Sequence, residues 1–225
     1  YRCDMQTLDW SALRYQHTAA VRATLAELYA PATANKMLSA LRGVLREAWR
    51  LGQVGAEEYR RAADLDSVRG EKVPAGRELP AGQIHALMLA CQGDATPAGS
   101  RDAAILGIMY SAGLRRAEIV ALDLADYRPD SSQLVVRGKG HKERIAHLIE
   151  GARDALCDWL DARGTVAGPL FSPVNRGGKV VPGRMTTQAV YNILHKRALQ
   201  AGLARSSPHD LRRTFVSNLL EKGAD

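Results

Sequence analysis

Apolar positions recur at three- and four-residue intervals over most of the chain, a spacing that predicts helices. The first such stretch runs from residue 7 to about residue 64, and its clearest part is Thr33–Leu51. One face of that part carries Leu38, Leu41, Leu45, Ala48 and Trp49. The pattern therefore predicts a helical first domain whose core takes up this face.

A second helical stretch begins after residue 80 and encloses a short β pattern. Helices are predicted at residues 81–91, 101–112, 116–122, 152–163, 187–201 and 208–222. Gly113 stands where a glycine would end the second of them. Short apolar runs at 134–137 and 144–148 predict two strands, and the glycine-flanked residues 138–143 would join them as a hairpin. The expected fold class is mainly α with a small antiparallel β-sheet.

The boundary between the two stretches is expected at residues 69–77. This segment holds two glycines, a proline and the basic residues Arg69, Lys72 and Arg77, which is typical of a mobile, cationic linker. The expected organisation is a helical domain over residues 1–68, the linker over 69–77, and a second domain over 78–225.

Composition indicates a soluble globular protein, with 46% apolar and 24% charged residues. The formal charge of +7 favours an anionic partner, such as nucleic acid or a lipid surface. Residues 1–68 carry nine basic and eight acidic side chains, so most of the excess lies from the linker onward. No apolar run reaches the roughly 18 residues that a membrane span requires. The first residues also lack the layout of a secretory signal.

Cysteine and histidine indicate neither a disulfide framework nor a metal centre. Cys3, Cys91 and Cys157 are odd in number, widely spaced and outside any CxxC motif. His141 and His147 lie in or beside a basic hairpin without a cysteine partner, so no metal and no cofactor are expected. A reducing, cytoplasmic setting fits this pattern best.

Three clusters carry groups that could bind an anion. In residues 111–119, Arg115 lies at a predicted helix–turn–helix corner, and Glu118 follows three residues later. A guanidinium and backbone N–H groups at such a corner converge on an anion. Surface capping with an ion pair would explain the same residues.

The other two clusters lie at the hairpin tip and at the start of the last predicted helix. Glycines on both sides of Lys139 would let a tight turn deliver its ammonium to a ligand, although a charged tip also resists edge pairing. Ser207 and Pro208 suit the N-cap and first position of a helix. His209 and Arg212 would then share one face of its first turn, facing either an anion or solvent.

The order of the clusters resembles that of the tyrosine recombinases, the phage integrase family that includes the Xer proteins. Arg115 lies in GLRRAEI, Lys139 in GKGHKER, and both His209 and Arg212 in PHDLRRTF. The resemblance covers nearly all of residues 78–225. It implies a tyrosine-recombinase catalytic domain preceded by a helical, SAM-like core-binding domain.

The resemblance also implies a reaction and a role for each matched residue. Family members cut one DNA strand at a time through a tyrosine, forming a 3′-phosphotyrosyl link and a 5′-hydroxyl, and they exchange strands within a tetramer. Arg115 and Arg212 match the arginines that hold the scissile phosphate. Lys139 matches the lysine that protonates the leaving oxygen, and His209 the histidine that assists proton transfer. Glu118 matches an acid expected to fix arginine geometry.

Further basic residues are candidate contacts to double-stranded DNA. Arg42, Arg46 and Arg50 share a face of the helix predicted at 33–51, and taken alone this pattern favours a solvated face over a DNA contact. The resemblance shifts the preference to DNA contact. On the resemblance, two domains joined by the basic linker would clamp the duplex. The full set of candidates is Arg42, Arg46, Arg50, Arg69, Lys72, Arg77 and Arg184.

The family's nucleophilic tyrosine follows the segment at which this sequence stops. Tyr110, Tyr127 and Tyr191 all precede the His209–Arg212 motif, so none matches the nucleophile. We therefore expect a parent recombinase that works as a tetramer, and a 225-residue chain that is monomeric and binds DNA without cleaving it. The alternatives are a type IB topoisomerase-like enzyme and a DNA-binding regulator or architectural protein that never cuts.

Overall fold

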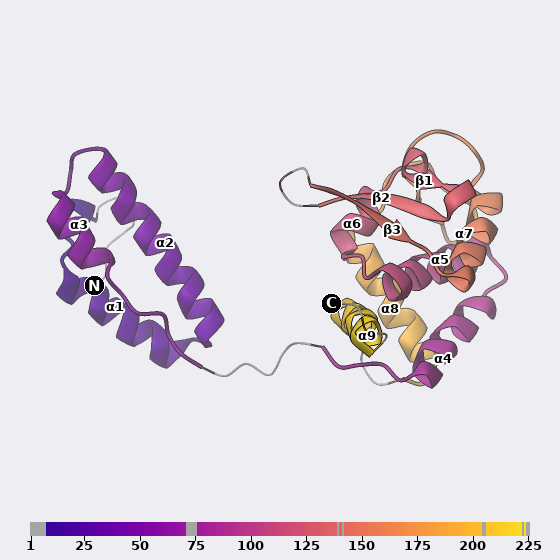
Figure 1. Cartoon of the computed structure of the whole chain (residues 1–225), viewed down its shortest axis with the longest axis horizontal. Coiled ribbons are helices and arrows are strands. Elements are labelled where there is room, and N and C mark those ends of the chain that lie inside the picture. The colour runs from indigo at the N-terminus through magenta and orange to yellow at the C-terminus, as the bar shows by residue number, and fades with distance from the viewer. Residues whose placement is uncertain are drawn as a thin grey trace. The chain divides into compact units, whose positions relative to one another are not determined.

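The computed structural model describes residues 8–70, 76–138, 140, 142–203, 206–221 and 223. The chain divides into two compact units, Tyr1–Val73 and Pro74–Asp225, which Figure 1 draws in indigo to purple and in magenta to yellow. Four residues considered above lie outside the described residues, namely Cys3, Lys72, Lys139 and His141.

The first unit consists of helices preceded by a 3-10 turn at Trp10–Ala12. Its helices are α1 (Tyr15–Leu28), α2 (Pro31–Arg50) and α3 (Ala56–Ala63), as Figure 1 shows. Pro31 occupies the first turn of α2, where its missing N–H leaves no intrahelical hydrogen bond unmade.

The apolar face of α2 supplies much of the first unit's core. Leu38, Leu45 and Ala48 are buried, as their spacing predicts. Trp49 differs from the prediction, because it is 41% exposed and its ring stacks on Tyr59 of α3 with centroids 5.3 Å apart. It is rotated about 100° around the helix from Ala48, which carries it to the edge of the buried face.

The second unit holds six α-helices and a three-stranded sheet among its described residues. The helices are α4 (Ala81–Gln92), α5 (Pro97–Ala112), α6 (Arg116–Ala121), α7 (Glu150–Arg163), α8 (Thr187–Gln200) and α9 (Pro208–Glu221). Each overlaps a helix that the apolar spacing predicts. The expected fold class, mainly α with a small antiparallel sheet, is confirmed.

The sheet is antiparallel, and its strands are β1 (Tyr127–Arg128), β2 (Gln133–Arg137) and β3 (Glu143–His147) in that order. The β2–β3 hairpin is the predicted one, with Val135 opposite Ile145. The sequence does not predict β1, because two residues are too few to show an alternating pattern. The buried side of β2 faces the helices through Leu134 and Val136.

Helix α5 forms the centre of the second unit's core. Eleven of its sixteen residues are buried, and α4, α7, α8 and α9 all contact it. Trp159 of α7, itself fully buried, packs against Phe171 and donates its indole N–H to the carbonyl of Leu170 at 2.9 Å. Because α5 is buried on nearly every side, the surrounding helices pack against a common central helix.

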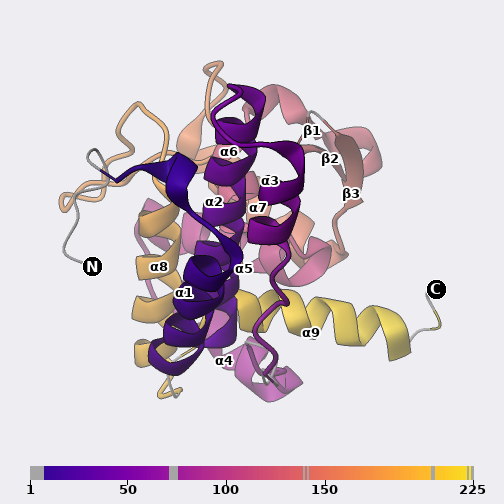
Figure 2. The same ribbon diagram turned by 90° about the vertical axis from the view of Figure 1, so that its left-hand side faces the viewer.

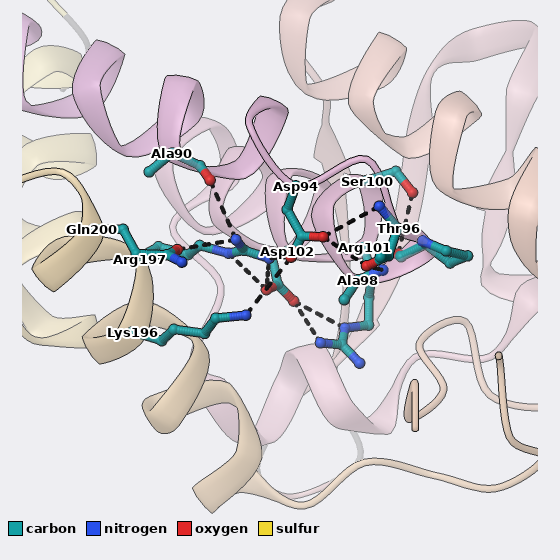
Figure 3. A network of polar contacts seen from close by, with 11 residues as sticks. Ala90, Asp94, Thr96, Ala98, Ser100, Arg101, Asp102, Lys196, Arg197 and Gln200 are labelled. Atoms are coloured by element: carbon teal, nitrogen blue, oxygen red, sulfur yellow. Dashed lines mark hydrogen bonds and ion pairs between the residues drawn. The ribbon is translucent and has the colours of Figure 1, made fainter. Parts of the chain in front are cut away.

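A buried ion-pair network ties α8 to the turn between α4 and α5 (Figure 3). Arg197 is fully buried, and it donates to Asp102 at 2.9 Å, to Asp94 at 2.7 Å and to the carbonyl of Ala90 at 3.2 Å. Arg101 donates to the other oxygen of Asp102 at 2.7 Å. Burial by itself lowers the pKa of Arg197, but its bonds to the two carboxylates outweigh burial and raise it.

The described part of the chain contains neither a membrane-spanning helix nor a cluster of metal-ligand side chains. No helix there is long and apolar enough to cross a membrane. Nor do three or more His, Cys, Asp or Glu side chains gather there as the ligands of a metal ion would.

Candidate active site

The site is built at the corner between α5 and α6. After α5 ends at Ala112, Gly113 has a φ of +59°, the left-handed conformation that commonly ends helices. A Cβ at Gly113 would overlap the ring of Phe215 in α9. Glycine therefore both turns the chain and lets α9 approach, and Arg115 follows as the N-cap of α6.

Glu118 holds the arginine of this corner in place. Its Oε2 accepts a hydrogen bond from the backbone N–H of Arg115 at 2.8 Å, and its Oε1 accepts one from Arg115 Nη1 at 3.0 Å. Oε2 also accepts a bond from Nη2 of Arg144 on β3 at 3.0 Å. Burial alone would raise the pKa of Glu118, but the bond from Arg115 and the charges of both arginines lower it. An ionised, buried carboxylate thus lies between two guanidinium groups and bonds to both. The orienting role expected of Glu118 stays a prediction.

The first turn of α9 lies against the same corner. Pro208 opens the helix, and Oδ2 of Asp210 accepts a bond from the N–H of Ser207 at 2.6 Å, which caps its start. Nη1 of Arg212 donates to the carbonyl oxygen of Gly113, so α9 is tied to the α5–α6 corner. Figure 2 shows α9 along its length, with its C-terminal end extending away from the other helices of the unit.

Arg115, His209 and Arg212 line one cavity of about 520 Å³. The other residues around this site cavity are Leu114, Arg116, Ala117, Thr187 and Pro208. The side chain of Arg115 is 64% exposed, so its guanidinium is anchored by Glu118 and still open to solvent. Hydrogen-bond donors from two distant parts of the sequence thus line one cavity, where they could bind an anion.

A second cavity, of about 470 Å³, shares Arg212 with the site cavity and is also lined by Arg144. Burial, together with the positive charges of Arg115 and Arg144, lowers the pKa of Arg212. Three guanidinium groups around the single carboxylate of Glu118 leave an excess of positive charge. That excess favours an anionic ligand.

Comparison with known proteins identifies the family of this chain. Residues 77–225 match the phage integrase family. The chain belongs to this family, the tyrosine recombinases. The tyrosine recombinase XerD of Caulobacter vibrioides is 36% identical over an alignment of 214 residues that covers 87% of this chain and 64% of the relative. XerD of Brucella suis biovar 1 is 34% identical over an alignment of 222 residues that covers 92% of this chain and 71% of the relative.

Solved structures of tyrosine recombinases share the fold. The XerH site-specific recombinase, bound to a palindromic difH substrate after cleavage, aligns with a TM-score of 0.74 at 19% identity, over 98% of this chain and 64% of that one. A lambda integrase tetramer bound to a Holliday junction aligns with a TM-score of 0.68 at 14% identity, over 96% and 62%. The chain spans less than two thirds of these two proteins and of the Caulobacter XerD.

The lysine expected of a tyrosine recombinase, Lys139, lies outside the described residues, but the base of its hairpin is described. The N–H of Gly138 donates to the carbonyl of Lys142 at 2.7 Å, which closes the turn. Arg137 pairs with Asp126 at 2.7 Å and with Glu143 at 3.1 Å. These bonds anchor the strands that carry the tip, and the role of Lys139 stays a prediction.

The three arginines of α2 differ in their surroundings. Arg42 is half-buried and donates to the backbone carbonyls of Ala63 and Leu65, where α3 ends. Arg46 and Arg50 are exposed, and both lie near Glu47, at 4.0 Å and 3.0 Å. The structure thus gives Arg42 a role inside the unit and leaves Arg46 and Arg50 at its surface. Contact of all three with DNA stays a prediction.

The remaining basic candidates also fall into two groups. Arg69 and Arg77 are exposed. Arg184 donates to the carbonyl of Val120 at 2.6 Å and to the carboxylate of Asp123 at 2.5 Å, so it stabilises the end of α6. A phosphate contact by these residues is likewise untested.

Arg144 is the site residue that sequence reasoning missed. It lies in the hairpin cluster, but only the strand register, with Val136 opposite, shows that it reaches Glu118. Side chains two apart on a strand share a face, so Arg144 lies on the side of β3 where Ala146 is buried. The sequence carries no local signal for this burial, because the neighbouring apolar residue, Ile145, is exposed.

Proposed function

We propose that this chain forms the DNA-binding and phosphate-activating part of a site-specific recombinase. The observation that carries the proposal is the convergence of Arg115, His209 and Arg212 on one cavity, with Glu118 orienting Arg115. Two guanidinium groups can hold the non-bridging oxygens of a scissile phosphate and stabilise the charge that develops in its pentavalent transition state. Donors that are already oriented stabilise such a state with little reorganisation.

In the proposed reaction, one ester bond at phosphorus replaces another. A tyrosine hydroxyl attacks the phosphorus, the bond to the 5′-oxygen breaks, and a 3′-phosphotyrosyl link and a 5′-hydroxyl result. His209 assists the proton transfer and hydrogen-bonds the phosphate, while Lys139 protonates the departing 5′-oxygen. Attack by a 5′-hydroxyl on the phosphotyrosyl link reverses these steps and rejoins the strands.

For the 225-residue chain itself we propose DNA binding without cleavage. Among the described residues no tyrosine lines the site cavity. The hydroxyl of Tyr110 accepts a bond from Asn218 at 3.2 Å, and the ring of Tyr191 lies 5.6 Å beneath the guanidinium of Arg116. We further propose that the complete protein works as a tetramer on DNA in the cytoplasm of its cell, and that this chain alone is monomeric.

Salt-dependent binding of a labelled DNA duplex tests the proposal. Arg115→Ala and Arg212→Ala should each weaken binding about tenfold, since a hydrogen bond to a charged group contributes about 1.5–3 kcal/mol. The slope of log K against log salt should flatten by about 0.9 for each phosphate that the variant no longer neutralises. Arg153→Ala is the matched control, because Arg153 is a half-exposed arginine on α7 that pairs with Asp154 and lies outside the site cavity.

Wild-type affinity and slope in both cavity variants would refute a phosphate site there. Covalent chemistry is read separately, on a denaturing gel. We expect no protein–DNA adduct from the 225-residue chain, and an adduct would show that one of its own tyrosines reaches the phosphate.

A further inference from the structure

A second face of the first two turns of α9 holds the chain where it enters the second unit. The segment Gly76–Leu79, here called the joining segment, runs along this face. The backbone N–H of Arg77 donates to Oδ1 of Asp210 at 2.8 Å, and the N–H of Leu79 donates to the hydroxyl of Thr214 at 2.9 Å. Asp210, Thr214 and Leu79 are 4%, 2% and 1% exposed, so water does not compete for these bonds.

The carboxylate of Asp210 links two parts of the chain, because each of its oxygens holds a different backbone N–H. Oδ2 accepts from Ser207 at the start of α9, and Oδ1 accepts from Arg77 in the joining segment. The Thr214 hydroxyl extends this link, since it donates to the carbonyl of Asp210 at 2.8 Å while it accepts from Leu79. Nη1 of Arg213, in turn, donates to the carbonyl of Gly76 at 3.1 Å.

Gly76 allows this close approach. Its φ is +97°, and a Cβ there would lie 3.2 Å from Oδ1 of Asp210 and 3.2 Å from the carbonyl carbon and oxygen of His209. The joining segment therefore touches the backbone of a residue that lines the site cavity. A side chain at this position would have to displace either the segment or the first turn of α9.

We propose that Asp210 is a positioning residue, which holds His209 and Arg212 in the site cavity by fixing the first turn of α9 to the joining segment. The inference rests on the proposed function, because it concerns the same phosphate site. Residues 209 and 212 lie on the cavity side of the turn whose other side Asp210 fixes. The joining segment is also the covalent route from the first unit, and Asp210, Thr214 and Arg213 connect it to the helix that carries the phosphate-binding arginine.

Loss of the negative charge of Asp210 and loss of its hydrogen bonds should change the affinity for DNA in opposite directions, so the positioning role can be tested. Removing a negative charge beside an anion site strengthens DNA binding by Coulomb attraction alone. Loss of the positioning bonds weakens it instead. Asp210→Asn retains the shape but offers one acceptor oxygen in place of two, so an amide N–H must face a backbone N–H.

The experiment measures affinity for a fluorescein-labelled duplex of about 30 base pairs between about 50 and 200 mM salt. We expect Asp210→Asn and Thr214→Val to bind about threefold to tenfold more weakly, with a slope flatter by about 0.9 because one phosphate is no longer neutralised. Thr214→Ser keeps the hydroxyl and should restore wild-type binding. Thr96→Ala removes the N-cap of α5, about 26 Å along that helix from Gly113, and should lower stability without changing the slope.

Circular dichroism shows which variants are folded. If Asp210→Asn is not folded, Gly76→Ala is used to test the positioning role instead. Gly164→Ala is its control, because Gly164 also has a positive φ, of +80°, and a Cβ there would have no neighbour within 4 Å. Gly76→Ala should flatten the slope, and Gly164→Ala should not. Wild-type or tighter binding by folded Asp210→Asn, with Arg212→Ala still weakened, would overturn the positioning role alone. Wild-type binding by Arg212→Ala as well would overturn the proposed function.

Discussion

Replacing Glu118 with glutamine tests whether one buried carboxylate organises the arginines of the site. Glu118 accepts three hydrogen bonds, from the N–H and Nη1 of Arg115 and from Nη2 of Arg144. Glutamine has a single acceptor oxygen, so it keeps at most two of these bonds and turns the third into a contact between donors. It also removes the charge that both guanidinium groups face.

The magnitude follows from the exposure of the partners. The bond to the Arg115 N–H resembles a helix cap, which contributes about 1 kcal/mol. The side chains of Arg115 and Arg144 are 64% and 42% exposed, so each ion pair adds only about 0–1 kcal/mol. We expect Glu118→Gln to lower the free energy of unfolding by about 2 kcal/mol, and the melting temperature by about 4–8 °C.

The pH dependence separates charge from packing. The pKa of Glu118 is lower in the folded protein than its ordinary value of 4.5, so its stabilising contribution is complete above that value and is lost as the pH falls through the folded pKa. Urea unfolding followed by circular dichroism should show the full difference between wild type and Glu118→Gln at neutral pH. The difference should shrink steadily below about pH 4.5.

Glu143→Gln is the matched control, because Glu143 also pairs with an arginine but its side chain is 59% exposed. It should change the free energy of unfolding by no more than about 0.5 kcal/mol. A Glu118→Gln difference that is equally small, or one that stays constant down to acid pH, would refute the argument that the ionised carboxylate organises the site.

Two further predictions concern the interior of the second unit. Arg197→Met should lower the free energy of unfolding by about 3–5 kcal/mol, because it removes one of the positive charges that balance Asp102, which is 1% exposed. Lys196→Met, at an exposed position 3.7 Å from Asp94, should change this free energy little. Equal effects of the two substitutions in urea unfolding would contradict the stabilising role of the ion-pair network. Burial raises the pKa of the Cys91 thiol to about 12, so iodoacetamide should modify exposed Cys157 and spare Cys91 in the native protein. Peptide mapping by mass spectrometry reads both sites, and rapid modification of Cys91 would contradict its burial.

Helix positions could be predicted from the sequence because their causes are local. The three- and four-residue spacing, Pro208 at a helix start and Gly113 at a helix end act within a few residues of one another. Strand β1 could not be predicted, since its two residues are defined only by pairing with β2. The prediction for Trp49 is wrong because the three- and four-residue spacing does not fix the width of the buried face, and Trp49 lies at the edge of that face, where its ring stacks on Tyr59.

The sequence motifs identify candidate site residues, but they do not predict which of these residues contact one another. The motifs name Arg115 and Arg212, but the bond from Arg212 to Gly113 spans 99 positions and follows only from the packing of α9 on α5. The same limit explains Arg184 and Arg42, whose guanidinium groups hold backbone carbonyls 62–64 and 21–23 residues away. Long-range bonds of this kind depend on the whole core and leave no local pattern.

The surplus of guanidinium groups around Glu118 favours phosphate binding but lowers the stability of the free protein. Arg115, Arg144 and Arg212 repel one another in the free protein, and the pKa of Arg212 is lowered in part for that reason. Arg115 and Arg144 pair with buried Glu118, so a laboratory selection for thermal tolerance alone would keep both and favour neutral hydrogen-bond donors at position 212. Such variants would gain robustness by giving up the affinity for phosphate. Selection for greater stability should for this reason be combined with a screen for DNA binding.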